Sequence, residues 1–326
     1  MVYHTFVGIG EVLFDIFEDG TETLGGAPLN FAVHIHQLAN HFGVGQGIVI
    51  SSTGSDPRGD KIIKSLEERK MSSRYIGRDD THRTGRVSVF MKNGEPGYQI
   101  EADTAWDYIS DRPELKELAG RCSAICFGSL AQRCNVSRKT IRNFLSNAPA
   151  TAIRLYDVNL RQNTLTGEAG YSPEIIGFSC QVATIIKANQ SELNTIFDIL
   201  GITCSSDNSI EGIMNRMEIL LGKFPAEAII VTRGEHGTVV LNRDGEFVVT
   251  GSRRTRQTPH PVGAGDACSA GILFGLTLKW DLQTTMELAN RLGADVATHP
   301  SATPIISDET LNIAQTRLLD NESVKN

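Results

Sequence analysis

Short apolar runs alternate with segments of helical periodicity along most of the chain, and this alternation restricts the fold more than any other feature. Runs typical of buried strands cover residues 2–9, 46–52, 124–127, 152–157, 182–187 and 228–232. Helical patterns cover about 137–147, 190–200 and 282–296. Because strands separated by helices usually pair in parallel, the order predicts an α/β fold with a mostly parallel sheet. The length of 326 residues fits one large domain or two smaller ones, and no composition shift forces a split.

A different rhythm occupies residues 86–100. Two short extended runs, 87–91 and 98–100, flank a turn-rich segment and predict a hairpin. Residues 12–17 form another extended segment, interrupted by Asp15. A hairpin inserted in a strand–helix series is a candidate lid, although most such hairpins are only structural.

The stretch around Gly263-Ala264-Gly265-Asp266 is a tight turn that opens into an apolar helical pattern. The first amides of a helix have no internal partner and lie at the positive end of its dipole, so this turn can bind a phosphate. A carboxylate repels anions, so Asp266 is a candidate base for an attacking hydroxyl. The alternative is an Asp that only complements the helix dipole, with glycines that only close the turn.

A second glycine turn, Gly25-Gly26-Ala27-Pro28-Leu29-Asn30, precedes another helical pattern near the start of the chain. Pro28 suits the first helical turn, since its missing N–H would have had no partner there. The glycines allow a ligand close to the backbone, and Asp15 and Asn30 offer hydrogen-bonding groups. An ordinary strand–turn–helix unit is the alternative reading.

Polar clusters follow three of the predicted strands, at residues 157–161, 187–192 and 232–237. The carboxyl ends of parallel strands meet at one edge of a sheet, where ligands of α/β proteins bind. We therefore expect these clusters and the two glycine turns to lie together.

The net charge of −7 argues against nucleic-acid or membrane partners. The run Arg253-Arg254-Thr255-Arg256 is short and is typical of a solvated loop, although it could meet nucleotide phosphates. The chain has neither a signal-peptide pattern nor a run of about 18 apolar residues, so we expect a cytoplasmic protein. Six cysteines without zinc-site spacing are interpreted as reduced thiols: Cys122, Cys126, Cys134, Cys180, Cys204 and Cys268.

With these motifs in this order, the chain resembles the ribokinase/PfkB family of carbohydrate kinases over nearly its full length. The resemblance rests on the turn at 25–30, the segment 261–267 and the intermediate pieces at 54–56, 157–161, 187–192 and 231–234. It implies a single domain over residues 1–326, with a three-layer α/β/α ribokinase-like fold. It also implies a small β lid formed by about residues 10–24 and 86–108. The lid is a candidate homodimer interface.

The resemblance further implies an ATP-dependent sugar kinase, with ATP and a small sugar on opposite sides of the central turn. Asp266 matches the general base, and the residues matching the anion hole are Gly263, Ala264 and Gly265. The positions that match sugar or substrate contacts are Asp15, Gly26, Asn30 and Arg161.

On the nucleotide side, Asn189 and Glu192 match a motif that organises Mg²⁺ and phosphate, with Glu192 on the metal side. The residues matching the nucleotide site are Thr232, Gly234, Gly237 and Asn290. A Walker-type phosphate loop is absent, and Mg²⁺ is expected to arrive with ATP. The sequence looks most like fructokinases through its segments 10–15 and 127–131, while the same framework phosphorylates 2-keto-3-deoxygluconate, ribose and nucleosides.

One departure concerns His260-Pro261, where members of the family usually carry Asp-Thr. It removes side-chain oxygens suited to a monovalent cation, so we expect little activation by potassium. It also leaves a catalytically silent sugar or nucleotide sensor as an alternative function. A dinucleotide-binding dehydrogenase is a weaker alternative, because Gly8-Ile9-Gly10 and Gly43-Val44-Gly45 lack the required Gly-x-Gly-x-x-Gly spacing.

Overall fold

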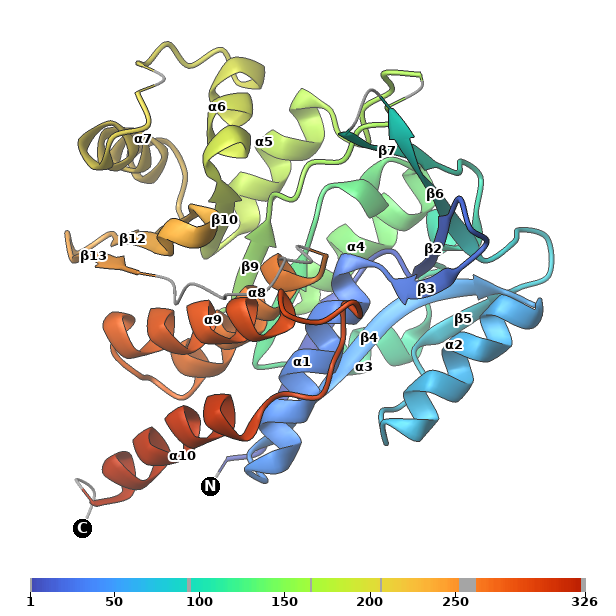
Figure 1. Ribbon diagram of the computed structural model, residues 1–326, viewed down its shortest axis with the longest axis horizontal. Helices are drawn as coiled ribbons and strands as arrows, with labels where there is room; N and C mark the ends of the chain where they lie inside the picture. Colours follow the sequence, from blue (N-terminus) through green and yellow to red (C-terminus); the bar gives the residue numbers. More distant parts are fainter. Residues whose placement is uncertain (1, 93–94, 165, 206, 252–261, 324–326) are drawn as a thin grey trace.

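The computed structural model describes residues 2–92, 95–164, 166–205, 207–251 and 262–323. A nine-stranded sheet crosses the molecule in the order β13-β12-β11-β10-β9-β8-β1-β4-β5 (Figure 1). Its strands are β1 (His4–Ile9), β4 (Gly45–Gly54), β5 (Ile76–Asp79), β8 (Ala124–Phe127), β9 (Ile153–Asp157), β10 (Ile185–Asn189), β11 (Ala228–Thr232), β12 (Thr238–Asn242) and β13 (Phe247–Thr250). All neighbouring pairs from β5 to β11 are parallel, and β12 and β13 add an antiparallel edge. The predicted mostly parallel α/β sheet is confirmed.

Helices cover both faces of this sheet and give a three-layer α/β/α arrangement. One face is covered by α1 (Ala27–His41), α2 (Pro57–Glu68), α8 (Ala264–Thr277), α9 (Leu282–Val296) and α10 (Asp308–Ser323). The other is covered by α3 (Pro113–Ala119), α4 (Asn135–Asn147), α5 (Pro173–Val182), α6 (Gln190–Ile199) and α7 (Ile210–Lys223). Among the described residues no helix is both long and apolar enough to span a bilayer.

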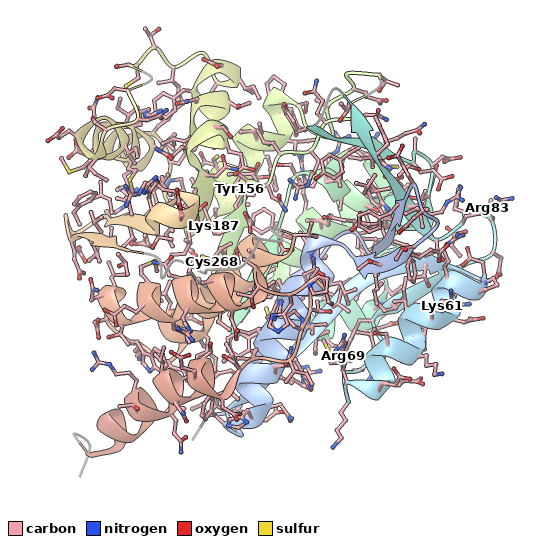
Figure 2. The ribbon with its side chains drawn as sticks, viewed as in Figure 1. Lys61, Arg69, Arg83, Tyr156, Lys187 and Cys268 are labelled. Carbon is pink, nitrogen blue, oxygen red and sulfur yellow. The ribbon has the colours of Figure 1, made fainter. Side chains whose placement is uncertain are left out.

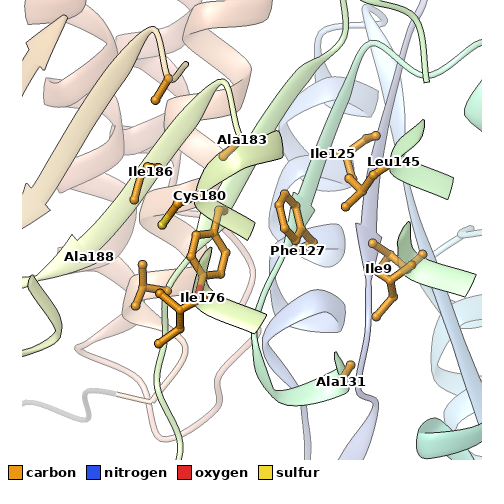
Figure 3. Close-up of a cluster of buried hydrophobic side chains, with 14 of the residues drawn as sticks. Ile9, Ile125, Phe127, Ala131, Leu145, Ile176, Cys180, Ala183, Ile186 and Ala188 are labelled. Atoms are coloured by element: carbon orange, nitrogen blue, oxygen red, sulfur yellow. The ribbon is translucent and has the colours of Figure 1, made fainter. Parts of the chain in front are cut away.

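Alternation along the strands divides the apolar core into two clusters, one on each face of the sheet. In β1, Val7 and Ile9 point into one cluster while Phe6 points into the other. Ile125 and Phe127 of β8 continue the first cluster (Figure 3). Successive side chains of a strand point to opposite faces, so a strand with helices on both sides is apolar throughout, which is the pattern seen in the sequence.

A separate four-stranded sheet has the order β3-β2-β6-β7. It contains β2 (Leu13–Phe17), β3 (Glu22–Gly25), β6 (Gly85–Lys92) and β7 (Glu95–Ile100). The short 3₁₀ helix η1 (Ala105–Tyr108) follows it. The predicted hairpin corresponds to β6 and β7, which pair antiparallel. The use of this sheet as a lid remains a prediction.

Several boundaries differ from the sequence prediction. Val182, predicted as the start of a strand, is the last residue of α5, and β10 begins only at Ile185. The α5 helix has a local cause, because Ser172 caps it through the Ile175 N–H and Pro173 opens it. Helix α2 begins at Pro57, since Asp56 caps it by accepting the Gly59 N–H. The sequence prediction also missed β3, β5, β12, β13, α3, α7 and α10.

Candidate active site

The carboxyl ends of the central strands surround the amino end of α8, as the polar clusters predicted. Asp157 at the end of β9 pairs in register with Lys187 of β10, and Asn189 pairs with Thr232 at the end of β11. Lys187 lies in the middle of the molecule near Cys268 of α8 (Figure 2). Residues far apart in the sequence therefore share one edge of the sheet.

The turn before α8 can be built only with glycine at its first position. Gly263 has φ +84°, and an added Cβ would lie 2.5 Å from the Ala302 carbonyl oxygen. Ala264 and Gly265 are the first two residues of α8, so their N–H groups have no partner within the helix. A Cβ on Gly265 would lie 3.7 Å from Lys187 Nζ, which places an ammonium group beside these amides. The combination is suited to an anion.

Asp266 lies in the first turn of α8 and is 8% exposed. Its Oδ2 accepts a 2.8 Å hydrogen bond from Asn30 Nδ2 of α1. Burial, together with the nearby Asp157 charge, raises the pKa of Asp266 to about 7, although Asn30, Lys187 and Arg161 act in the opposite direction. A carboxyl group with this pKa can accept a proton near neutral pH and is a stronger base than an exposed aspartate.

A buried ion pair lies directly behind the turn. Lys187 Nζ donates to Asp157 Oδ2 over 2.8 Å, and Ser269 Oγ of α8 donates to the same oxygen over 2.7 Å. Burial lowers the pKa of the Lys187 ammonium, but the Asp157 carboxylate more than offsets this and the pKa is raised. Lys187 therefore stays charged, and Asp157, which accepts from both Lys187 and Ser269, links β9, β10 and α8.

Asp15 and Gly26 lie near the start of α1, where a Cβ built on Gly25 would lie 3.0 Å from Asp15 Oδ2. Asp15 is half-buried on β2, and burial raises its pKa to about 6 while the Arg161 charge lowers it. Gly26 caps α1 with φ +108°, and an added Cβ would lie 2.5 Å from the Glu11 carbonyl oxygen. A small cavity here is lined by Glu11, Pro28, Asp157 and Asp266, among others.

The loop after β11 offers mainly main-chain groups to a ligand, because two of its residues are glycines. Thr232 ends the strand, and Gly234 and Gly237 have φ +56° and +79° around the 3₁₀ turn η3 (Gly234–His236). Asn290 lies on α9, where its Nδ2 contacts the carbonyl oxygens of Thr250 at 3.2 Å and Gly251 at 3.3 Å. Asn290 therefore holds the end of β13 in addition to any contact with a ligand.

Asn189 and Glu192 form a capping box at the start of α6. Asn189 Oδ1 accepts the Glu192 N–H at 2.9 Å, while Glu192 Oε2 accepts the Asn189 N–H at 2.8 Å. Glu192 Oε1 also accepts the Leu160 N–H at 3.1 Å. Burial raises the pKa of Glu192. Within the described ranges no group of three His, Cys, Asp or Glu side chains is placed to hold a metal ion.

Comparisons with known proteins agree with this arrangement. Residues 172–309 match the sequence model of the pfkB family carbohydrate kinases. A Salmonella typhimurium fructokinase is 25% identical over 307 residues, covering 90% of this chain and 93% of that protein. The chain contains a PfkB-family carbohydrate kinase domain, with the family match on residues 172–309.

Two further relatives and one solved structure are also similar to this chain. A Thermoanaerobacterium thermosaccharolyticum ATP-dependent 6-phosphofructokinase is 26% identical over 88% of this chain and 85% of that protein. A putative sugar kinase of Pyrococcus horikoshii is 28% identical, over 59% of this chain and 64% of its own length. The structure of Xylella fastidiosa fructokinase with bound ATP superposes with a TM-score of 0.80 at 19% identity, over 96% of this chain and 98% of that chain. These comparisons show a sugar kinase of the PfkB family with a ribokinase-like fold.

The structure brings most of the predicted site residues of this kinase together. Asp266 and Asn30, separated by 236 positions, are hydrogen-bonded. Arg161 is exposed, and its charge acts on Asp15, Asp266 and Glu192. The segments 253–256 and 260–261, for which a phosphate contact and a cation effect were considered, lie outside the described residues. The roles of all these residues remain predictions.

Two features of the site were missed. Ser269 binds Asp157 from the second turn of α8, and Glu11 lines the cavity with Asp266. Glu11 follows a buried strand and is only 6% exposed. An acidic residue immediately after an apolar run was the available signal, and Asp15 was recognised by a similar pattern.

Proposed function

We propose that this chain transfers the γ-phosphoryl group of MgATP to a primary hydroxyl of a small sugar, with fructose as the sugar. The observation that carries the proposal is the buried Asp266 carboxylate, which follows the glycine turn directly and has a pKa near neutrality. An anion site needs no carboxylate beside it. Proton transfer from an attacking hydroxyl, in contrast, needs a base that accepts the proton.

In this proposal Asp266 accepts the proton of the sugar hydroxyl as its oxygen attacks the γ-phosphorus. The bond between that phosphorus and the bridging oxygen of ADP breaks, and ADP leaves with the electron pair. Asn30 orients the Asp266 carboxylate through its 2.8 Å hydrogen bond. Asp15, Gly26 and Arg161 hold the sugar so that the hydroxyl faces the phosphate. Positioning of this kind supplies much of the rate enhancement in phosphoryl transfer.

The transferring phosphoryl group would lie on the N–H groups of Gly263, Ala264 and Gly265, with the Lys187 ammonium beside them. Donors fixed before the reaction stabilise charge without reorganising during it. The Asp157–Lys187 pair supports this role, because both side chains are buried and hydrogen-bonded.

The nucleotide would bind along the β11 loop, through Asn189, Thr232, Gly234, Gly237 and Asn290. Carboxylate oxygens of Glu192 and Asp157 suit Mg²⁺, and the lack of three grouped ligands among the described residues fits an ion held mostly by nucleotide and water. When bound, Mg²⁺ neutralises phosphate charge. Glu192 keeps its two backbone hydrogen bonds, so we propose that its carboxylate contacts Mg²⁺ through a water molecule.

Fructose is proposed because fructokinases from Salmonella typhimurium and Escherichia coli are each 25% identical to this chain over 90% of its length. A second candidate is 2-keto-3-deoxygluconate, since a Thermotoga maritima 2-dehydro-3-deoxygluconokinase superposes with a TM-score of 0.77 at 16% identity, over 95% of this chain and 97% of that chain. Ribose and nucleosides are further candidates, because a yeast adenosine kinase matches 83% of the chain at 23% identity.

The test is ADP release with MgATP and fructose, 2-keto-3-deoxygluconate, ribose or adenosine. We expect the highest kcat/KM with fructose. A higher value with another sugar would change the substrate but keep the kinase. Sugar and ATP binding without ADP release would instead identify a catalytically silent sensor.

We also propose that residues 1–326 form one kinase domain whose four-stranded sheet closes over the sugar, and that the protein acts in the cytoplasm. A homodimer through this sheet is proposed as well. Phe17 on β2 and Tyr98 on β7 are 38% and 37% exposed, which supports a contact surface there.

A further inference from the structure

His34 is a buried histidine of α1 for which the proposed reaction has no use. Its Nε2 lies 2.9 Å from the carbonyl oxygen of Ala302, in the loop 297–307 that joins α9 to α10. Both residues are buried, so each polar group depends on the other for a hydrogen bond. Because a buried polar group without a partner is costly, this bond holds the loop against α1.

The protonation state of His34 fixes the direction of this hydrogen bond. Burial lowers the pKa of His34 to about 4, although the Ala302 contact and the Asp295 charge act in the opposite direction. The imidazole is therefore neutral near pH 7 and carries one N–H. Because a carbonyl oxygen only accepts, that proton lies on Nε2. The Nδ1 atom has no hydrogen-bond partner among the described residues.

Ala302 is the residue against which the glycine turn before α8 packs. A Cβ added to Gly263 would lie 2.5 Å from the Ala302 carbonyl oxygen and 2.8 Å from its Cα. Gly263 is the N-cap of α8, and the N–H groups of Ala264 and Gly265 follow it directly. Groups packed this closely cannot move independently, so a shift of Ala302 shifts the turn and its amides.

The same face of α1 carries two further contacts to this region. Asn30, one turn before His34, donates to the carboxylate of the proposed base. Gln37, one turn after His34, donates to the Pro304 carbonyl oxygen at 3.0 Å and accepts the Ile306 N–H at 3.1 Å. Residues three or four apart share one face of a helix. Helix α1 therefore fixes the proposed base and the loop behind the turn relative to one another (Figure 1).

We propose that His34 is a positioning residue for phosphoryl transfer, which keeps the glycine turn before α8 in its anion-binding shape by holding the Ala302 backbone. This inference rests on the proposed kinase function. Amides that are fixed before the reaction stabilise developing charge without reorganising during it. A loosened turn should therefore slow catalysis more than it weakens the binding of either substrate.

The first experiment measures steady-state ADP release by the wild type, His34→Leu and His34→Gln, with MgATP and the sugar that gives the highest kcat/KM. Leucine occupies the site without a donor, whereas the glutamine Nε2 lies about as far along the side chain as the histidine Nε2 and can donate to the same oxygen. In His34→Leu we expect kcat to fall by at least about tenfold while both KM values stay within about twofold. His34→Gln should keep kcat within about threefold of the wild type.

The matched control is His36→Leu. His36 is a second buried histidine of α1, and its Nδ1 accepts the Gly47 N–H of β4 at 3.3 Å, so it contacts the sheet rather than the loop 297–307. We expect this control to lose thermal stability as His34→Leu does but to keep the wild-type kcat. A folded His34→Leu enzyme with the wild-type kcat would overturn the proposal, and so would an equal fall of kcat in His36→Leu.

His34→Asn serves if His34→Leu fails to fold. It carries the same carboxamide as His34→Gln on a side chain one methylene shorter, so its N–H should not reach the Ala302 oxygen. We expect its kcat to lie at least about tenfold below that of His34→Gln. Equal kcat values for the two variants would overturn the proposal, since only the reach of the donor distinguishes them.

Hydrogen exchange gives a readout that needs no activity. The Ala267 N–H donates to the Gly263 carbonyl oxygen at 2.9 Å, so its exchange rate reports opening of the glycine turn. We expect this amide to exchange at least about fivefold faster in His34→Leu or His34→Asn than in the wild type, and at the wild-type rate in His36→Leu. If no sugar supports ADP release by the wild type, the proposed kinase function fails, and the exchange rate alone decides whether His34 holds the turn. An unchanged rate in the folded His34 variants would overturn that role.

Discussion

The two sides of the α8 turn are built in different ways. On the proposed sugar side, Asp266 and Asn30 are 8% and 3% exposed. On the proposed nucleotide side, Gly234 is exposed and Gly237 contributes backbone at positive φ, while Asn290 is bound to neighbouring carbonyl oxygens. One side depends on buried, titratable side chains and the other on the path of the main chain.

This difference has a physical basis. In the proposed reaction a proton moves on the sugar side, and burial adjusts the pKa of the group that accepts it. A nucleotide phosphate needs space and convergent N–H donors, which the path of the main chain can supply. Side-chain changes should therefore be severe on the sugar side and mild on the nucleotide side, unless they replace a glycine at positive φ.

Asp266→Asn tests the sugar side with the largest expected effect. We expect kcat to fall by about 10²- to 10⁴-fold, because an amide cannot accept the sugar proton. Steady-state ADP release measures this, with circular dichroism as the check on folding. A well-folded variant that retains more than roughly a tenth of the wild-type kcat would remove Asp266 from the role of base.

The same variant has an expected effect on stability with the opposite sign. The pKa of Asp266 is raised to about 7 in the folded protein, so its favourable contribution is lost as the pH rises from about 4 to about 7. Asp266→Asn should therefore unfold a few degrees higher than the wild type above pH 7, and this advantage should shrink toward pH 4. Equal Tm values at pH 8 would contradict the pKa shift.

Asp15→Ala should have the next largest effect. Loss of a hydrogen bond to a charged group costs about 1.5 to 3 kcal/mol, so kcat/KM for the sugar should fall by roughly 10- to 150-fold. The KM for ATP should stay within about twofold, because Asp15 lies on β2, on the sugar side. If the Asp15→Ala change impairs the use of sugar and of ATP equally, Asp15 has a structural role and does not distinguish the two sides.

On the nucleotide side, Gly234→Ala tests whether ATP binding depends on the main-chain conformation of the loop. Gly234 has φ +56° with nothing within 4 Å of an added Cβ, so the cost is conformational, about 1 to 2 kcal/mol. We expect the KM for ATP to rise several-fold and the KM for the sugar to remain unchanged. Gly222→Ala in α7, also in open space but without positive φ, is the matched control and should leave both KM values unchanged. An unaltered ATP KM in Gly234→Ala would show that the loop path is not critical.

The smallest effect is expected from potassium, which would act on the turn between the two sides. His260-Pro261 lacks the side-chain oxygens that alkali cations prefer, and this segment lies outside the described residues. We expect the initial rate in potassium chloride to exceed that in a tetramethylammonium buffer of equal ionic strength by less than about tenfold, equivalent to roughly 1.4 kcal/mol. Stronger activation would mean that an ion stiffens the turn despite this departure.

Much of the fold followed from the sequence because periodicity is a local property. The strand at 124–127 and the helix at 282–296 were predicted with the bounds that the structure has. At 182 the prediction was wrong, because an apolar run at the end of a helix is compatible with helix and strand alike. Local pattern alone could not decide between them.

The sequence by itself determined the parallel sheet, the two glycine turns and the identity of residues such as Asp266 and Asn30, since these depend on neighbouring residues and recognisable motifs. Only the tertiary structure decided that Asn30 donates to Asp266, that Ser269 binds Asp157 and that Glu11 lines the same cavity. It also decided which carboxyl groups have raised pKa values. Desolvation and charge coupling depend on groups brought together from distant parts of the chain, and spacing along a sequence contains no measure of burial.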